Sequence, residues 1–177
     1  MKIINTPATL DDLDIIHQYE EASYHPDEAA SRKQLENRII YASKSGPELF
    51  TVARDMDSDD QKVIAFLCTT LTNADLVTDE SMSVHEPNGK TICLHSVCVS
   101  PDYRHKGIGT KLLSTWIKEL KDINKANGNG QGKKYNRIAL LSRPKLVSFY
   151  ENVGFKKIGT SEVVHGPEPW IDCILDL

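Results

Sequence analysis

The chain has 177 residues, of which 40% are hydrophobic and 26% are charged, and its net charge at pH 7 is −4. This length and composition predict one globular domain, residues 1–177, whose core needs neither disulfides nor a metal ion. The acidic balance argues against nucleic-acid binding, and no apolar run approaches the roughly 20 residues that span a bilayer membrane.

The cysteines and the N-terminus indicate a reducing compartment. Cys68, Cys93, Cys98 and Cys173 form no CxxC pair, and the first residues lack the basic-then-apolar pattern of a signal peptide. Cys93 and Cys98 lie an odd number of positions apart on one expected strand, so their side chains point to opposite faces. We therefore expect a cytoplasmic protein with reduced cysteines, and by default a monomer.

The first 72 residues predict one strand, two helices and a hairpin. A short strand at residues 2–5 precedes a helix over residues 8–24, in which Thr9 caps with Asp12 three positions later. Ser31, followed by glutamine three positions later, starts a second helix that runs to about residue 43. Two antiparallel strands, residues 46–55 and 61–72, are expected to flank the turn-like DMDSDD.

The rest of the chain alternates strands with helices. Residues 73–90 have little periodicity and predict a loop, whereas TICLHSVCVS (91–100) predicts a strand that is apolar on both faces and therefore central in a sheet. A helix is expected over residues 107–124, then a flexible linker (126–134), a strand (136–142), a short helix (145–153) and two strands (155–164 and 170–177). The sum is a mixed α/β domain.

The turn between the central strand and the long helix is basic and contains two glycines. It reads Arg104-His105-Lys106-Gly107-Ile108-Gly109-Thr110. Glycine lets the backbone approach a ligand closely, and the uncapped N–H groups of a first helical turn attract an anion such as a pyrophosphate. A Walker loop is absent, and the dinucleotide fingerprint GxGxxG fails because Leu112 stands at the third glycine position. On these residues alone, a plain helix entry with a basic surface is an equal alternative.

The turn and a second motif together resemble the GNAT superfamily of N-acetyltransferases. R-x-x-G-x-G follows a strand that ends V-x-V, and SFYENVGF comes later in the chain. SGPELF, LHSVCV and LVSFYENVGF are similar to the arylalkylamine (serotonin) N-acetyltransferases and the fungal polyamine acetyltransferases. The resemblance implies an α/β (α+β) fold with a central mixed, mostly antiparallel sheet of about seven strands and about four helices. It also implies that the fourth and fifth strands splay apart to admit acetyl-CoA.

The same resemblance assigns a cofactor site. It implies that the backbone of the strand end pairs with the pantetheine arm and that the turn cradles the pyrophosphate. The residues so assigned are Val97, Cys98, Val99, Arg104, His105, Lys106, Gly107, Ile108, Gly109 and Thr110. Pairing with a strand is physically reasonable, because a strand splayed from its neighbour offers its backbone groups to an amide-containing ligand.

His95 and Tyr150 are the catalytic candidates. Acetyl transfer needs a neutral amine, and histidine, with a reference pKa of about 6.5, is able to accept the surplus proton at pH 7. In the arylalkylamine family this strand carries two histidines two residues apart; here Cys93 occupies the first position and His95 the second. The family places a tyrosine where Tyr150 stands, with its hydroxyl at the cofactor sulfur, although Tyr150 also lies on the buried stripe of its helix. The alternative is a buried cysteine that carries the acetyl group.

The resemblance implies an acyltransferase that moves an acetyl group to a small primary amine, an arylalkylamine or a polyamine, in a ternary complex. Alternatives are a protein or peptide N-acetyltransferase and a non-catalytic acyl-CoA-binding regulatory domain. Acids in the first two helices, the 73–90 loop and the last loop favour a polycation, whereas aromatic residues there favour an arylalkylamine. The acids are Glu20, Glu21, Asp27, Glu28, Asp75, Asp79, Glu80, Glu86 and Glu168, and the apolar candidates are Tyr24, Pro26, Phe50 and Trp170.

Overall fold

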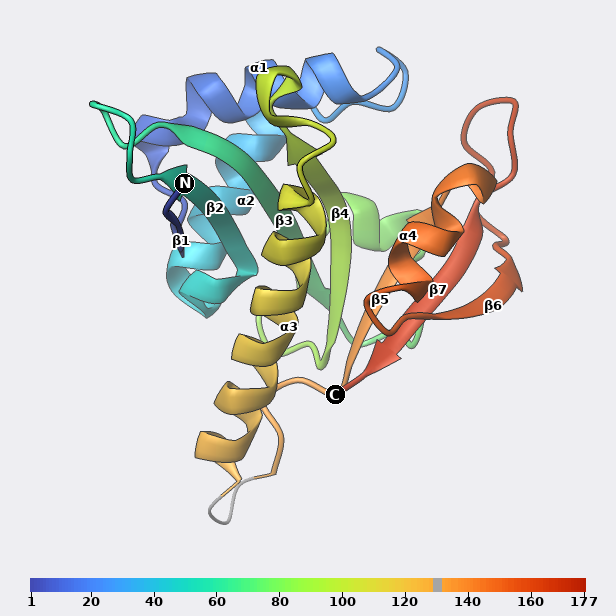
Figure 1. The fold of residues 1–177 in the computed structure, drawn as a ribbon. Coiled ribbons are helices and arrows are strands. Elements are labelled where there is room, and N and C mark those ends of the chain that lie inside the picture. Colours follow the sequence, from blue (N-terminus) through green and yellow to red (C-terminus); the bar gives the residue numbers. More distant parts are fainter. Residues whose placement is uncertain (129–131) are drawn as a thin grey trace. The chain divides into compact units, whose positions relative to one another are not determined.

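A computed structural model describes residues 1–128 and 132–177, and these form two compact units. Unit 1 consists of residues 1–69 and 96–113, and unit 2 of residues 70–95 and 114–177. Three elements, β3, β4 and α3, contribute residues to both units (Figure 1). The expected linker 126–134 lies partly outside the described residues.

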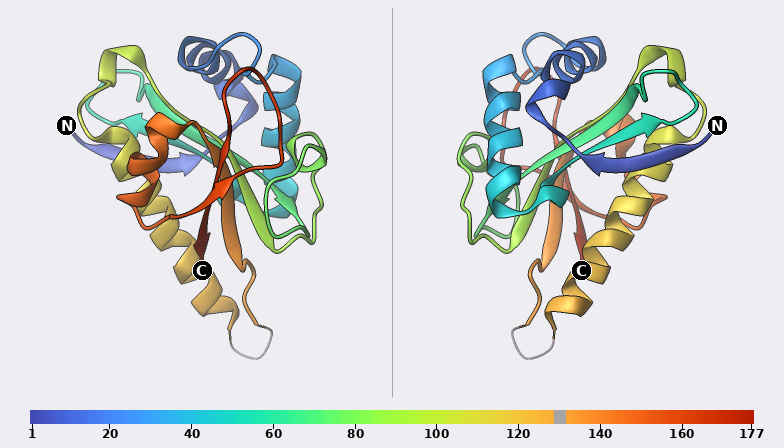
Figure 2. Two further views of the ribbon diagram at one scale, coloured as in Figure 1. Left: turned by 90° about the vertical axis from the view of Figure 1, so that its right-hand side faces the viewer. Right: turned by 90° about the vertical axis from the view of Figure 1, so that its left-hand side faces the viewer.

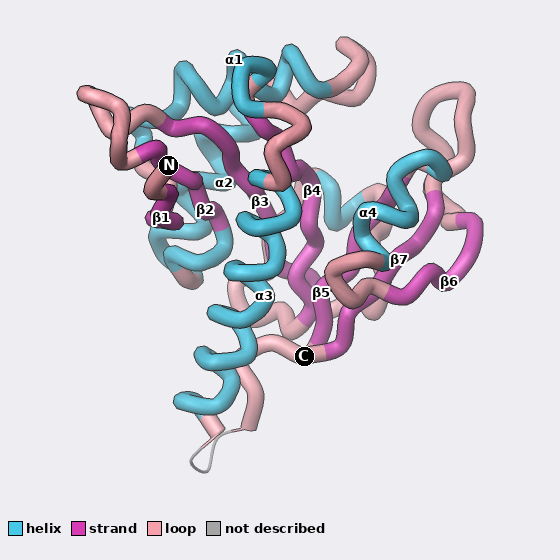
Figure 3. The backbone as a smooth tube through the Cα atoms, viewed as in Figure 1, coloured by secondary structure: helices cyan, strands magenta, loops and turns pink. Residues whose placement is uncertain are grey.

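The described residues form a seven-stranded sheet in the order β1-β2-β3-β4-β5-β7-β6 (Figure 3). The strands are β1 (Ile3–Pro7), β2 (Phe50–Asp55), β3 (Val63–Thr72), β4 (Thr91–Val99), β5 (Arg137–Ser142), β6 (Lys156–Thr160) and β7 (Ile171–Asp176). The α-helices are α1 (Leu13–Ser23), α2 (Arg32–Ser45), α3 (Ile108–Asn127) and α4 (Val147–Glu151). β4 is the fourth strand of seven, as its two apolar faces predict. The expected mixed sheet with four helices is confirmed.

Local capping explains where the first two helices begin. The Thr9–Asp12 capping box encloses a 3-10 turn at Leu10–Asp12, so α1 itself begins later than expected, at Leu13. Ser31 caps α2 by accepting a hydrogen bond from the backbone N–H of Gln34 at 3.1 Å. Tyr19 of α1 donates its hydroxyl to the backbone oxygen of Val63 in β3 at 2.8 Å, which fixes the helix against this part of unit 1. The β2–β3 hairpin is antiparallel, as expected.

Unit 2 contains the parallel step of the sheet. β4 pairs with β5 in parallel, while β7 pairs antiparallel with both β5 and β6. The described β4–β5 ladder ends at Leu94↔Leu140, although β5 continues to Ser142. The resemblance predicts that the two strands separate at this point. Within unit 2, α4 and the 73–90 segment lie on opposite sides of β5 and β7 (Figure 2, left).

The 73–90 segment is more ordered than its composition suggests. It contains a 3-10 turn at Glu80–Met82, and Glu86 fastens it to the end of β3. The Glu86 carboxylate accepts hydrogen bonds from the Thr72 hydroxyl at 3.0 Å and from the backbone and side-chain nitrogens of Asn73 at 3.1 and 2.6 Å. These donors lower the pKa of Glu86. None of the described helices is long and apolar enough to cross a bilayer.

Candidate active site

The second half of β4 has two different faces. His95, Val97 and Val99 are half-buried, whereas Ser96, Cys98 and Ser100 are buried. Because successive strand side chains point to opposite faces, one face of this segment is covered by protein and the other stays partly open. The half-buried face carries two valines that a fully covered strand would bury, which fits a strand whose open side receives a ligand.

A buried carboxylate supports the covered face within unit 1. Glu20 of α1 is only 2% exposed, and its Oε1 accepts hydrogen bonds from the Ser96 hydroxyl at 3.0 Å and from the backbone N–H of Ala30 at 3.1 Å. The Cys98 thiol lies 3.4 Å from Oε2. Glu20 was expected among acids that attract a cationic substrate, but these contacts make it a buried support for β4.

Burial raises the pKa of Glu20 above its usual 4.5. The folded state therefore holds a proton that the unfolded chain has already lost, so the free energy of unfolding falls as pH rises through the raised pKa. We expect the free energy of unfolding of the native chain, compared with that of Glu20→Gln, to be highest at acid pH and to decline as pH rises. Urea unfolding at several pH values between about 4.5 and 8 measures this difference.

The control for this prediction is Glu36→Gln, which removes a partner of Lys33 (3.2 Å) in a surface pair on α2. Exposed pairs of this kind contribute little to stability, so the free energy of unfolding of Glu36→Gln should stay close to that of the native chain across the same pH range. The role given to Glu20 would be contradicted if the free energy of unfolding of the native chain, compared with that of Glu20→Gln, stayed constant or increased with rising pH.

The turn before α3 has the backbone of an anion site. His105 (φ 62°) and Gly107 (φ 75°) are both left-handed, and residues 104–107 are exposed. Lys111 donates its backbone N–H to the Gly107 oxygen at 3.1 Å, which closes the first turn of α3. The amides of residues 108–110 precede that bond and belong to the helix end that offers N–H groups to an anion.

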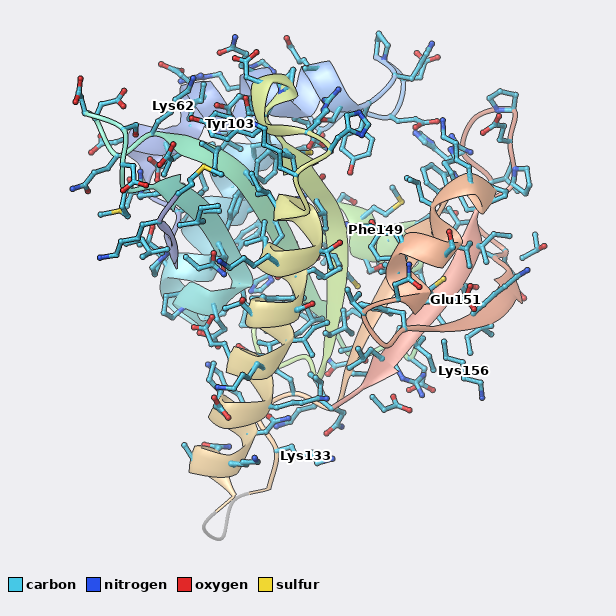
Figure 4. All side chains as sticks on the ribbon, viewed as in Figure 1. Lys62, Tyr103, Lys133, Phe149, Glu151 and Lys156 are labelled. Atoms are coloured by element: carbon cyan, nitrogen blue, oxygen red, sulfur yellow. The ribbon has the colours of Figure 1, made fainter. Side chains whose placement is uncertain are left out.

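The basic side chains of the turn also hold it in place. Arg104 donates to the backbone oxygen of Val99 at 3.3 Å and, at the end of α1, to the Ala22 oxygen at 3.4 Å and the Ser23 hydroxyl at 3.3 Å. The Lys106 ammonium lies 5.4 Å from the centre of the Tyr103 ring. Tyr103, labelled in Figure 4, donates to Asp55 at 3.0 Å. Arg104 therefore has a structural contact as well as a charge beside the expected cofactor site.

The Thr70 hydroxyl holds the His95 ring in place. His95 Nε2 lies 2.7 Å from this hydroxyl, which also lies 3.2 Å from the backbone oxygen of Ser81. The three groups form a hydrogen-bonded chain that links β4, β3 and the 73–90 segment. Sequence reasoning missed Thr70 and Ser81, because an apolar strand and an irregular loop give no signal that they meet.

Thr70→Val should weaken catalysis by loosening His95 while leaving its imidazole in place. Loss of one neutral hydrogen bond costs about 1 kcal/mol, so we expect kcat to fall about fivefold and the pH profile of kcat to shift. Steady-state rates across pH measure both effects. Thr70→Ser keeps the hydroxyl and should retain the native profile, and equal losses in the two variants would argue against the hydrogen bond as the cause.

Tyr150 is anchored by aromatic packing within unit 2. Its side chain is 9% exposed, and its ring makes edge-to-face contacts with Phe149 and Phe155 at centroid distances of 5.1 and 5.7 Å. Figure 4 labels Phe149 on α4. The expected burial of Tyr150 on its helix is confirmed, and Val147 is buried on the same helix.

The structure distributes the expected site residues between the two units. Val97 to Val99 and Arg104 to Thr110 belong to unit 1, where the strand end leads directly into the turn. His95 and Tyr150 belong to unit 2.

Other residues expected near the acceptor have structural contacts. Phe50 is fully buried in unit 1, where it stacks on Phe66. In unit 2 the Arg143 guanidinium lies over the Trp170 ring, 3.7 Å from the ring centroid. The same guanidinium lies 3.9 Å from the Glu168 carboxylate. An apolar slot that includes Phe50 is therefore not formed.

The cysteines are poor candidates for an acyl-carrying nucleophile. All four are free and buried. Burial raises the pKa of Cys68 and Cys173 to about 11, and it raises that of Cys98 well above the usual 9.0, where the neighbouring Glu20 adds to the effect. These three thiols are protonated at neutral pH, and a protonated thiol is a weak nucleophile. In unit 2, Cys93 packs in an apolar cluster with Val77 and Ala139.

Comparison with known proteins identifies the family. Residues 47–157 match the acetyltransferase (GNAT) domain family. The chain is 30% identical over 108 residues to a serotonin N-acetyltransferase of Mesocricetus auratus, a match that covers 61% of this chain and 48% of that protein. The chain thus spans about half the length of the curated relatives it matches.

Two solved structures share the fold. One is the GphF GNAT-like decarboxylase in complex with isobutyryl-CoA, with a TM-score of 0.73 and 16% identity over 99% of each chain. The other is the NatC complex bound to Gag peptide and CoA, with a TM-score of 0.72 and 18% identity over 100% of this chain and 99% of that chain. With the family match over the strand, turn and helix described above, the chain belongs to the acetyltransferase (GNAT) domain family.

Proposed function

We propose that residues 1–177 act as one domain that transfers an acetyl group from acetyl-CoA to a small primary amine in a ternary complex. The observation that carries the proposal is the turn at residues 104–110, whose left-handed backbone and helix N-terminus fit a diphosphate. The half-buried face of Val97 and Val99 leads into that turn and supports a role in holding the pantetheine arm. The serotonin N-acetyltransferase relative supports an amine as acceptor.

His95 has the role of base in this proposal. An alkylammonium has a pKa near 10.4, so about one molecule in several thousand is neutral at pH 7 and able to attack the thioester carbon. The C–N bond forms as the C–S bond breaks, and the amine must lose a proton. His95 accepts it at a ring nitrogen, directly or through water, while the Thr70 hydroxyl, 2.7 Å from Nε2, holds the ring.

Tyr150 has the role of hydrogen-bond donor to the departing sulfur. Full proton transfer from a phenol (pKa about 10) to a thiolate (pKa about 8.5, with cysteine as the reference) is uphill by about 2 kcal/mol. A hydrogen bond that strengthens as charge develops on sulfur needs no such transfer. The packing of the Tyr150 ring against Phe149 and Phe155 restricts its orientation, which such a donor requires.

Release of the CoA thiol from acetyl-CoA tests the function. Purified protein is incubated with acetyl-CoA and, separately, with tryptamine, phenethylamine, putrescine, spermidine or a short peptide. Saturable release with a small amine supports the proposal. Release with the peptide alone would instead indicate a peptide N-acetyltransferase. Binding of CoA by calorimetry without release for any acceptor would indicate a non-catalytic acyl-CoA-binding domain.

A further inference from the structure

The end of β3 is held by the 73–90 segment. The described β2–β3 ladder reaches only to Cys68 of β3, and the last residues of the strand lie beyond it. Within unit 2, the backbone oxygen of Leu71 accepts from the Glu86 N–H at 2.9 Å, and the Leu71 N–H donates to His85 Nδ1 at 3.1 Å. The segment therefore pairs with Leu71 as a neighbouring strand would, with an imidazole nitrogen in place of one backbone carbonyl.

Two further contacts fit the segment closely to the same strand end. Thr72 donates its hydroxyl to the Glu86 carboxylate at 3.0 Å. Gly89 is buried, and a Cβ added to it would lie 2.7 Å from backbone atoms of Thr72. Non-bonded carbon atoms pack at about 3.5–4.0 Å, so only glycine allows this approach. The position of the segment on β3 is thus set by side-chain size as well as by hydrogen bonds.

The hydrogen bond from Leu71 requires an unprotonated Nδ1 on His85. A neutral imidazole has one acceptor nitrogen, and in His85 this nitrogen faces the Leu71 N–H. An imidazolium carries a proton on both nitrogens and accepts at neither. Protonation of His85 therefore sets one N–H against another and removes this contact between the segment and β3.

The charged groups around His85 come from its own segment and from β4. Glu86 follows it in the chain, and its carboxylate accepts the three hydrogen bonds described above. The β3 residues that the segment contacts, Thr70–Thr72, are uncharged, and His95 of β4 lies next to the first of them. The other charged side chains of the segment are exposed: Asp75, Asp79, Glu80 and Lys90. Burial is the main influence on the ring, and it lowers the pKa of His85.

The same segment supports the imidazole of His95. Ser81 belongs to it, and the Thr70 hydroxyl lies 3.2 Å from the Ser81 backbone oxygen and 2.7 Å from His95 Nε2. Thr70 precedes Leu71 in β3, so both residues depend on the segment for their partners. A segment that leaves Leu71 also withdraws the oxygen that stands behind Thr70.

We propose that His85 is a positioning residue for His95, and that protonation of His85 releases the 73–90 segment from β3. The release is a property of the fold, whereas its effect on rate rests on the proposed N-acetyltransferase function. In the released segment the ring regains the reference pKa of about 6.5, so the segment stays bound above that pH and is lost progressively below it.

Hydrogen exchange at the Leu71 amide tests the release without any substrate. In the native protein, NMR should show protection of this amide falling by about tenfold or more between pH 7.5 and pH 4.5, after correction for intrinsic exchange. His85→Asn places an amide oxygen near the position of Nδ1 but does not titrate, so its Leu71 protection should vary little with pH. Gly89→Ala keeps the histidine and displaces the segment, so protection should already be low at pH 7.5.

The control for exchange is His17→Gln, which should keep the native pH dependence. Circular dichroism checks that the variants fold; if His85→Asn does not, the native protein decides. Equal Leu71 protection at pH 4.5 and pH 7.5 in the native protein would overturn the inference, and so would the same fall in a folded His85→Asn.

Rates with an amine acceptor test the link to His95. On its acid side, log kcat against pH should be steeper in the native protein than one proton accounts for, because both histidines must be neutral. His85→Asn should reduce this slope to that of one proton, and His17→Gln should leave it unchanged. Equal slopes in the native protein and His85→Asn would overturn the positioning role. No CoA release with any acceptor would overturn the proposed function and that role with it, while Leu71 exchange still decides whether the segment is released.

Discussion

His95→Gln should lower kcat by about 100-fold or more, because a positioned general base contributes about 10²–10⁴ to rate. The variant suits this test because the glutamine side-chain amide still has N–H groups to offer the Thr70 hydroxyl, whereas it has no basic nitrogen. The affinity for CoA, measured by calorimetry, should stay within about twofold of the native value, since the proposed diphosphate site uses the turn at residues 104–110.

The pH dependence of kcat provides the check on mechanism. In the native protein the rate should rise as the imidazole loses its proton, and this limb should be absent from the variant. His17→Gln is the control, because His17 lies on α1 and pairs with Glu21 at 2.9 Å, so its removal should leave kcat and the pH profile unchanged. An unaltered rate and profile in His95→Gln would remove His95 from the mechanism.

Gly107→Ala should weaken CoA binding by about tenfold. The glycine is left-handed at φ 75°, a conformation that costs a residue with a Cβ roughly 1–2 kcal/mol. An added Cβ meets no atom within 4 Å, so the penalty comes from the backbone and not from a clash. Relief of that strain moves the amides of the first turn of α3 away from the diphosphate. Isothermal calorimetry with CoA measures the loss.

Gly132→Ala is the matched control for this substitution. Gly132 has nearly the same conformation (φ 76°) and the same open surroundings, but it lies in the segment between α3 and β5. Both variants should lose a similar amount of thermal stability, whereas the control should bind CoA as the native chain does. Similar CoA affinities in the two variants would mean that the turn does not hold the diphosphate.

Local chemistry in the sequence was sufficient for most of the fold. The Thr9–Asp12 and Ser31–Gln34 capping pairs are confirmed, because each involves residues three positions apart, and such contacts form whatever the rest of the chain does. The two apolar faces of β4 predicted its central place, because only a strand covered on both sides buries both. The turn at residues 104–110 was found in the same way, since its glycines and basic residues are adjacent in the chain.

Contacts between distant residues were decided only by the tertiary structure. Thr70 and Ser81 form a hydrogen-bonded chain with His95 from 25 and 14 positions away, and nothing in their local sequence indicates that partner. Glu20 was expected among the acids that favour a cationic substrate, but the packing of α1 buries it against Ser96 and Cys98, 76 and 78 positions later.

The sequence by itself thus determined most of the elements, the family resemblance and the place of the glycine-containing basic turn, all of which depend on residues close together in the chain. The tertiary structure decided hydrogen-bond partners, burial and charge pairing, because these depend on which side chains meet after the chain has folded.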